Sequence, residues 1–412
     1  MTRPSTPPPP ARTERTLPER PQLLVRLAAL LVVVGAVGWR RGEYFSGSLD
    51  PVVVAKALVS LVALAAALLA AQSADRRRVG TGSLWLLGVL LGGSVFGALT
   101  AGNLVAGGVV AVRVALVAAT VVLLLRAAPA LHVLLALAQA CGAVALIAAV
   151  SGLPTLAEGR LAGRVPAIDP NELALLAGIV VVVLAWRAVL GQAGPAAAVT
   201  GAFFLAVVWA TGSRTGLLML LFGILVMGLY LRRPQVGLVV GGLVLGAVGV
   251  LALAGTGAVG GFVERGGDGT STLGSRFIAW RAALTWATSD WQTVFGGGLS
   301  VKIIRVRGQY WDTQPLDSTW ASLLVQTGVL GLAVAAVWIC WTFRGALLAP
   351  LPHRVLFLGL LVFLVGRSLL ESGLFDATPA FVLFVAVSLL AEGASRRRLR
   401  AEAPEEPAAA PG

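Results

Sequence analysis

Charged residues are scarce in this chain, and their scarcity is the first constraint on what the protein can be. Asp, Glu, Lys and Arg make up 12% of its 412 residues, whereas soluble domains carry about 25%. Hydrophobic residues account for 57%, and the mean hydropathy is +0.88. This composition excludes a soluble cytosolic enzyme and predicts an integral membrane protein.

Cysteine and histidine are nearly absent as well. Cys141 and Cys340 both lie in long apolar runs, so a disulfide framework is not expected. The two histidines, His132 and His353, are too few to predict a His-based metal site. The sequence also contains no Walker motif and no visible Ser-His-Asp arrangement. We therefore expect neither a metal ion nor a cofactor.

The charge that is present is mostly positive, with 32 Lys and Arg against 19 Asp and Glu and a net charge of +13. Such an excess fits a nucleic-acid-binding protein or a membrane protein with basic inner loops. The layout favours the membrane protein, because every predicted inner loop contains Arg once the N-terminus is placed in the cytoplasm. Roughly 17 basic residues then lie inside and roughly 11 outside. We predict cytoplasmic termini and no nucleic-acid partner.

The apolar runs predict an all-α polytopic membrane protein with about 12 transmembrane helices. Residues 1–22 and 393–412 are expected to be disordered cytoplasmic tails, 23–263 the first nine helices, 264–317 a large extracytoplasmic loop, and 318–392 the last three helices. The expected spans are 23–39, 51–72, 82–101, 104–126, 129–153, 170–190, 194–212, 214–231, 235–263, 318–343, 353–371 and 375–392.

Two outer segments, 154–169 and 264–317, are longer than a turn, and loops of that length are usually functional or disordered. The second is rich in aromatic residues, which argues against disorder. Its stretch SRFIAWRAALTWATSDW predicts one amphipathic helix that ends at the glycines 296–298. The residues expected on one side of that helix are Phe277, Trp280, Leu284 and Ala287.

Arginines at the outer face are not explained by the charge rule for inner loops. Arg214 follows Ser213 between two predicted spans, where it is either a snorkelling residue in a tight turn or a bidentate clamp for phosphate. Arg160 and Arg164 precede a helix start in which Asp169 is the expected N-cap.

Arg276 and Trp280 lie four residues apart in the large loop, either as a surface cation–π pair or as part of a site. Asp317, at the end of that loop, is either a helix N-cap or a general base at the membrane surface. Arg367 and Glu371 form either a mutual ion pair or a functional group near the outer end of a span.

Three other charged residues near the predicted spans have structural interpretations. Asp376 is expected to cap the next helix. Lys56 and Arg113 lie within spans and either snorkel or pair, so they receive no functional role.

From about residue 150 to residue 390, the chain resembles the bacterial O-antigen ligase and Wzy-type polymerase superfamily. Four features carry the resemblance, in this order: Arg160 and Gly163 before Pro170-Asn171; Ser213-Arg214-Thr215-Gly216; Arg276 and Trp280 before the glycines 296–298; and Asp317-Ser318 before Leu323, Gly328 and Gly331. The stretch Arg367-Ser368-Leu369-Leu370-Glu371-Ser372 is also similar to the family.

The resemblance implies a metal-independent glycosyltransferase with a GT-C-like membrane fold in the bacterial plasma membrane. Its donor would be a polyprenyl-diphosphate-linked glycan, its acceptor a glycan or other surface molecule, and its partners the bilayer and other polysaccharide-assembly proteins. Arg214 and Arg276 would grip the donor diphosphate. The remaining expected substrate-binding residues are Arg160, Arg164, Asn171, Ser213, Trp280, Arg367 and Glu371.

One departure from the family concerns the general base. The ligases place a His at the end of the large loop, where this chain has Asp317. Either Asp317 takes that role, or the reaction needs no strong base, or activity has been lost. A lipid-linked-glycan transporter and a non-catalytic envelope-assembly protein therefore remain alternatives, although the two halves show no clear inverted repeat typical of transporters.

Overall fold

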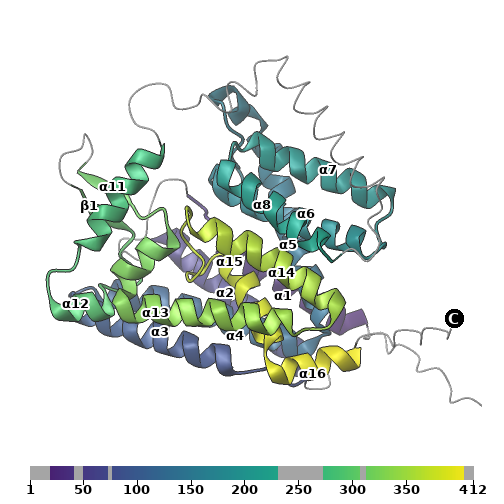
Figure 1. Cartoon of the computed structure of the whole chain (residues 1–412), viewed down its shortest axis with the longest axis horizontal. Coiled ribbons are helices and arrows are strands. Elements are labelled where there is room, and N and C mark those ends of the chain that lie inside the picture. Colours follow the sequence, from purple (N-terminus) through teal and green to yellow (C-terminus); the bar gives the residue numbers. More distant parts are fainter. Residues whose placement is uncertain (1–18, 41–49, 73–76, 231–271, 307–311, 403–412) are drawn as a thin grey trace, which may run out of the picture.

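The computed structural model describes residues 19–40, 50–72, 77–230, 272–306 and 312–402, which fold almost entirely into helices (Figure 1). The helices are α1 (Glu19–Ala36), α2 (Pro51–Gln72), α3 (Gly82–Thr100), α4 (Leu104–Ala127), α5 (Ala130–Gly152), the 3-10 helix η1 (Leu153–Glu158), α6 (Pro170–Val189), α7 (Pro195–Ala210), α8 (Arg214–Gly228), α11 (Thr272–Leu284), α12 (Asp290–Phe295), α13 (Thr319–Leu347), α14 (Leu351–Ser368), α15 (Pro379–Ala391) and α16 (Gly393–Glu402). Two short strands, β1 (Ile303–Arg305) and β2 (Thr313–Pro315), pair antiparallel.

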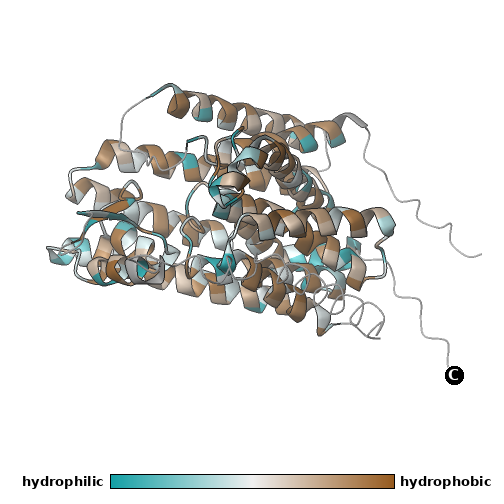
Figure 2. Cartoon of the chain, turned by 90° about the horizontal axis from the view of Figure 1, so that it is seen from above, coloured by the Kyte–Doolittle hydropathy of each residue, from teal (hydrophilic) through white to brown (hydrophobic). Residues whose placement is uncertain are grey.

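Apolar helices dominate the described chain, as they do in a multi-pass membrane protein (Figure 2). Seven are long and apolar enough to cross a bilayer: α2, α3, α4, α5 with η1, α6, α13 and α14. An eighth span is counted if α15 and α16, which meet at an 82° bend, are taken together. Shorter apolar helices cover Gln22–Ala36, Pro195–Ala210 and Arg214–Gly228. The expected span 235–263 lies outside the described residues, so the count of about 12 spans stays a prediction.

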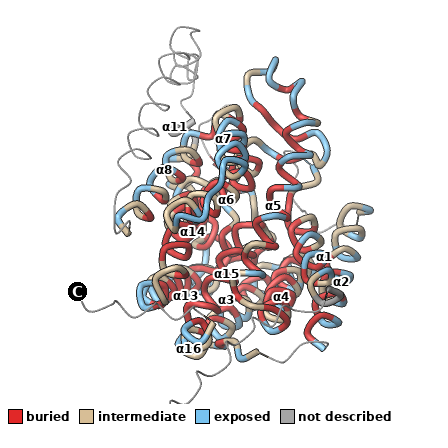
Figure 3. Tube along the Cα trace, turned by 90° about the vertical axis from the view of Figure 1, so that its right-hand side faces the viewer, coloured by how far each residue is buried: buried red, intermediate tan, exposed pale blue. Residues whose placement is uncertain are grey.

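The core of the bundle is centred on α15, every residue of which is buried (Figure 3). Peripheral helices instead expose large apolar side chains, for example Val54, Leu58 and Leu61 on α2. In lipid such exposure carries no penalty, because the acyl chains are as apolar as the side chains. Around the core, α13 packs against α3 and α14, and α14 packs against α8.

Glycine allows α8 to approach α14 closely. A Cβ on Gly359 or Gly366 of α14 would overlap the side chain of Met227 or Met219 on α8, respectively. Small residues at such positions let the backbones of two membrane helices come together. One end of this tight α8–α14 pair borders the cavity described below.

The large loop contains two helices, and the single helix expected through the stretch SRFIAWRAALTWATSDW is wrong: α11 ends at Leu284 and α12 begins at Asp290. The side of α11 that packs on the protein also differs from the expected one. Ala279 and Ala283 are buried in a small core with Ile304, Leu316 and Val325, whereas Phe277 and Leu284 are exposed. Two small residues one turn apart permit closer packing than the large ones.

A break in α13 fixes the loop on the bundle. Gly328, inside α13, adopts φ +65°, and a Cβ there would overlap the backbone of Val294 in α12. The break leaves the carbonyls of Val325 and Gln326 free to accept hydrogen bonds from the N–H groups of Gly297 and Gly298, both at 2.9 Å. The glycines expected to end the loop helix therefore do so, and they also bind α13.

Residues 393–402 form helix α16 where a disordered tail was expected. Its Arg-rich composition indicates disorder, but tertiary contacts outweigh that tendency. Leu399 is fully buried, and Ser395 accepts a hydrogen bond from the N–H of Gly80 at 3.0 Å. Residues 19–22, expected to belong to the disordered N-terminal tail, instead begin helix α1. The rest of the two expected tails, residues 1–18 and 403–412, lies outside the described residues.

The close contact at Gly328 predicts a specific loss of stability. Gly328→Ala should lower the free energy of unfolding by about 1–3 kcal/mol, because it forces a positive φ on alanine and crowds Val294. Gly108→Ala is the matched control, since a Cβ at that position in α4 would meet no atom within 4 Å. Thermal unfolding in detergent should show a lower Tm for the first variant only, and equal Tm values would contradict the account.

Candidate active site

A cavity of about 1300 Å³ opens at the end of the bundle that carries α11. Its walls come from the start of α6, the start of α8, α11, α13 and the end of α14 with the residues after it. Much of the lining is apolar, including Leu218, Leu324, Leu332, Ala336 and Leu369. The cavity also brings together most of the predicted site residues: Arg160, Asn171, Ser213, Arg214, Arg276, Trp280 and Glu371.

Arg160 and Asn171 join three separate parts of the chain on one wall. The Nε of Arg160 donates to the carbonyl of Thr211 at 2.8 Å, and its Nη2 donates to Oδ1 of Asn171 at 3.1 Å. The backbone carbonyl of Asn171 accepts from Nη2 of Arg367 at 2.8 Å. Asn171 thus lies between two guanidinium groups, one lining the cavity and one buried beside it.

Arg214 stands at the N-terminus of α8, with Ser213 as the N-cap residue. Ser213 is buried, its side chain makes no capping hydrogen bond, and Arg214 is exposed to the cavity it lines. The unpaired N–H groups of a helix start carry a partial positive charge. The guanidinium and the helix N-terminus therefore place two positive features at the same point of the wall.

Arg276, on α11, faces two carboxylates. Its Nη2 lies 3.2 Å from Oε1 of Glu371, and its Nε lies 4.0 Å from Oδ2 of Asp317. Thr319 fixes the position of Glu371 by donating to its backbone carbonyl from both the amide and the hydroxyl, at 3.2 and 2.9 Å. Arg276 thus ties the large loop to the segment after α14.

Burial governs the acidity of both carboxyls. It raises the pKa of Glu371, against the opposing effects of the Arg367 and Arg276 charges. It also raises the pKa of Asp317, where Arg276 opposes the shift. Raised pKa values make both groups better proton acceptors than a solvent-exposed carboxylate.

Trp320 is a lining residue that the sequence analysis missed. It is the second residue of α13, and no motif in the sequence singled it out. Among the described residues, the buried indole N–H groups of Trp280 and Trp320 and the buried hydroxyl of Ser213 have no hydrogen-bond partner.

Three predicted site residues do not line the cavity. The side chain of Arg164 is half exposed, and its Nη2 lies 3.9 Å from Oε1 of Glu158. Arg367 is buried, with its guanidinium 6.0 Å from the ring centre of Phe363. Asp317 lies outside the lining, with its Oδ2 4.0 Å from Nε of Arg276, and the neighbouring Ser318 lines the cavity instead.

Several structural interpretations of these residues are wrong. Ser318, not Asp317, is the N-cap residue of α13. The prediction that Asp169 is the N-cap residue of α6 is confirmed, although its side chain makes no capping hydrogen bond. Within the described chain, Glu371 pairs with Arg276 rather than Arg367, and Arg276 makes no cation–π contact with Trp280.

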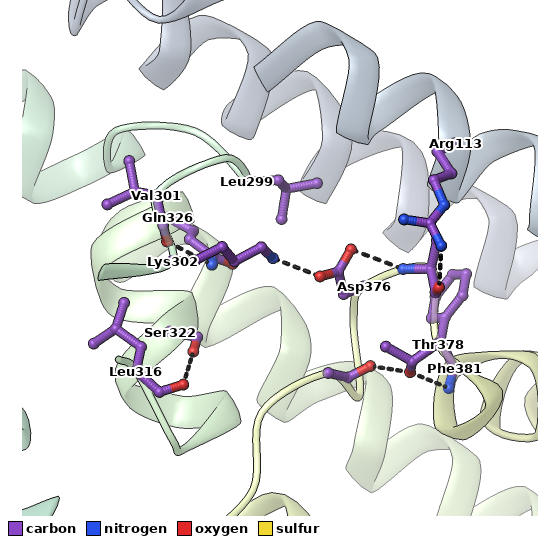
Figure 4. Close-up of polar contacts among 12 residues, drawn as sticks. Arg113, Leu299, Val301, Lys302, Leu316, Ser322, Gln326, Asp376, Thr378 and Phe381 are labelled. Atoms are coloured by element: carbon purple, nitrogen blue, oxygen red, sulfur yellow. Dashed lines mark hydrogen bonds and ion pairs between the residues drawn. The ribbon is translucent and has the colours of Figure 1, made fainter. Parts of the chain in front are cut away.

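Asp376 does not cap α15 either, because Thr378 does so by accepting from the N–H of Phe381. Asp376 instead pairs with Lys302 at 2.5 Å, while Arg113 donates to the carbonyl of Ala377 at 3.4 Å (Figure 4). Burial alone would raise the pKa of Asp376, but the Lys302 cation lowers it below the ordinary value. This pair is a second tie between the large loop and the segment after α14.

Lys56 and Arg113, the two charged residues within spans that received no functional role, both bind carbonyls at the C-terminal end of α1. Lys56 donates to the carbonyl of Val37 at 2.7 Å, and Arg113 donates to that of Gly35 at 2.8 Å. Cations at a helix C-terminus satisfy its free carbonyls, so both residues have a structural explanation. Among the described residues, no cluster of three or more His, Cys, Asp or Glu side chains could hold a metal ion.

The Arg276–Glu371 pair predicts a pH-dependent stability. Arg276→Gln removes the ion-pair partner of the largely buried Glu371 carboxylate and should cost about 1–3 kcal/mol of unfolding free energy. The pKa of Glu371 rises further in that variant. A carboxyl with a raised folded-state pKa loses stability as the pH rises towards that pKa. Thermal unfolding should therefore show a larger deficit at about pH 8 than at about pH 5.

Glu371→Gln provides the background that isolates the pair. In that background, Arg276→Gln should cost less and should add little pH dependence, because no carboxylate remains at residue 371. An equal cost in both backgrounds would show that the two side chains are not coupled.

No protein-family model matches the chain, and no curated protein is similar enough to be a relative.

Proposed function

We propose that this protein is a membrane glycosyltransferase of the O-antigen ligase and polymerase type. It would transfer polyprenyl-diphosphate-linked glycans to a glycan or other surface acceptor at the outer face of the bacterial plasma membrane, beside other polysaccharide-assembly proteins. The observation that carries the proposal is the cavity itself, in which arginines from three parts of the chain meet an apolar wall within a helical membrane protein. A lipid-linked diphosphate likewise combines an anionic diphosphate, which arginines can bind, with an apolar chain, which an apolar wall can bind.

The polar half of the cavity suits the diphosphate. Arg214 and Arg276 approach from α8 and α11, and Arg160 lies on the α6 side. When the acceptor oxygen bonds to the sugar carbon, the bond from that carbon to the diphosphate oxygen breaks, and the leaving diphosphate gains negative charge. Fixed guanidinium groups stabilise that charge without reorganisation in a site with little water.

The apolar half suits the polyprenyl chain. Leu218, Leu324 and Leu332 belong to the two helices that flank the cavity, α8 and α13. Trp280 on α11 and Trp320 on α13 also line the cavity, and their indole N–H groups have no partner among the described residues. Aromatic rings that also carry an N–H group can stack on sugar faces and bind hydroxyl oxygens.

A carboxylate would accept the proton of the attacking hydroxyl. The sequence places this role on Asp317, in the position where the ligases have a His. Glu371 borders the cavity directly, whereas Asp317 contacts the Nε side of Arg276. Diphosphate binding at Arg276 would compete with Glu371 for that guanidinium and free the carboxylate, so we assign the proton acceptor to Glu371 and the positioning of Arg276 to Asp317.

Binding of undecaprenyl diphosphate to the purified chain tests the arginine assignment. Arg214→Gln and Arg276→Gln should each weaken binding about ten-fold or more, because each removes a charged hydrogen-bond donor to phosphate. Arg281→Gln is the matched control, since Arg281 is exposed on the same helix as Arg276 and does not line the cavity. Wild-type affinity in both cavity variants would rule out the proposed donor site.

Cell-surface polymer made by cells that depend on this chain tests the carboxylates. Glu371→Gln should lower polymer yield about 100-fold or more, as expected for loss of a general base, while Asp317→Asn should retain a measurable fraction. Membrane levels of each variant must match the wild type. The reverse ranking would return the proton acceptor to Asp317.

A further inference from the structure

Helix α16 lies at the opposite end of the bundle from the cavity and is fixed there on one face (Figure 1). At the 82° bend, Glu392 accepts hydrogen bonds from the N–H groups of Gly82 and Ser83 at 2.9 and 2.7 Å. Arg398 donates to the carbonyls of Leu125 and Ala128, both at 2.8 Å. These contacts hold α16 at a steep angle to α15, which is the orientation of a helix lying along a membrane surface.

The other face of α16 carries cations that lack a carboxylate partner. Arg396 and Arg400 lie one turn apart, and Nη1 of Arg396 donates to the carbonyl of Gly345 at 3.5 Å, beside Arg344 at the end of α13. Burial and the charges of Arg400 and Arg344 lower the pKa of Arg396. Within the described chain no acidic group lies within 4.0 Å of these three residues, whereas Arg77 and Arg398 both pair with Glu402. The protein thus neutralises some arginines at this end and leaves this cluster positive.

Apolar side chains beside the cluster mark the level of the bilayer boundary. Trp341, one turn before Arg344 on α13, is 52% exposed, and Val337, one turn earlier still, is 56% exposed. Tryptophan favours the interface between headgroups and acyl chains, and an exposed valine deeper in the span favours the acyl chains themselves. A ligand at this point would meet guanidinium groups and apolar side chains within two turns of helix.

We propose that Arg344, Arg396 and Arg400 form a binding site for the phosphate headgroup of an anionic phospholipid. The phosphate lies among the three guanidinium groups, and the acyl chains descend along Trp341 and Val337 of α13. Each cation near an anionic membrane surface contributes attraction, and the bound headgroup relieves the mutual repulsion of the cluster. The site is separate from the proposed glycosyltransferase cavity and does not depend on that function.

Native mass spectrometry of the purified full chain with added phosphatidylglycerol or phosphatidylcholine tests the site. The wild type should retain phosphatidylglycerol in preference, and the double variant Arg396→Gln/Arg400→Gln should bind it about ten-fold more weakly. Arg344→Gln, which leaves α16 intact, should also weaken binding. Arg187→Gln is the matched control, because Arg187 is an exposed arginine at the same end of the bundle.

Three outcomes would overturn the proposal. Equal retention of the two lipids would show that no headgroup charge is recognised. An equal loss in Arg187→Gln would show a diffuse basic surface rather than a site. Full competition by inorganic phosphate at millimolar concentration would show a free-anion site, in which the acyl chains play no part. Matched Tm values of all variants in detergent show that the folded state is retained.

Discussion

The break in α13 at Gly328 is the contact on which the arrangement of the large loop depends. In an apolar environment, backbone groups freed by a helix break must find partners within the protein. Here the carbonyls of Val325 and Gln326 bind the N–H groups of Gly297 and Gly298, so the loop attaches to the bundle through its backbone. Two ion pairs, Arg276–Glu371 and Lys302–Asp376, then tie the same loop to the segment after α14. As a result, α11 is held beside the cavity with Arg276 in its wall.

Much of this arrangement could be predicted from sequence, because its signals are local. Apolar runs mark the described helices to within a few residues, the glycines at 296–298 mark the end of a loop helix, and arginines at the outer face mark candidates for anion binding. The cavity brings several of these candidates together from α6, α8 and α11. Their catalytic and binding roles stay predictions.

Which charged side chains pair with one another could not be predicted from the sequence, because the pairing depends on how segments distant in the sequence pack together. Arg276 and Glu371 are 95 positions apart, and Lys302 and Asp376 are 74 apart, so neither pair has a spacing that a sequence pattern reveals. The i, i+4 ion pair expected between Arg367 and Glu371 does not form, because Arg367 instead donates to the carbonyl of Asn171. Helix α16 was missed for a similar reason, since its Arg-rich sequence is stabilised by carbonyls on other helices.

The account's central claim is that one cavity holds both halves of a polyprenyl diphosphate. A structure of the full chain bound to undecaprenyl diphosphate measures this directly. The account predicts the diphosphate within hydrogen-bond distance of the Arg214 and Arg276 guanidinium groups, with the lipid chain along Leu218 and Leu332 between α8 and α13. A diphosphate bound elsewhere on the protein, with this cavity empty, would contradict it.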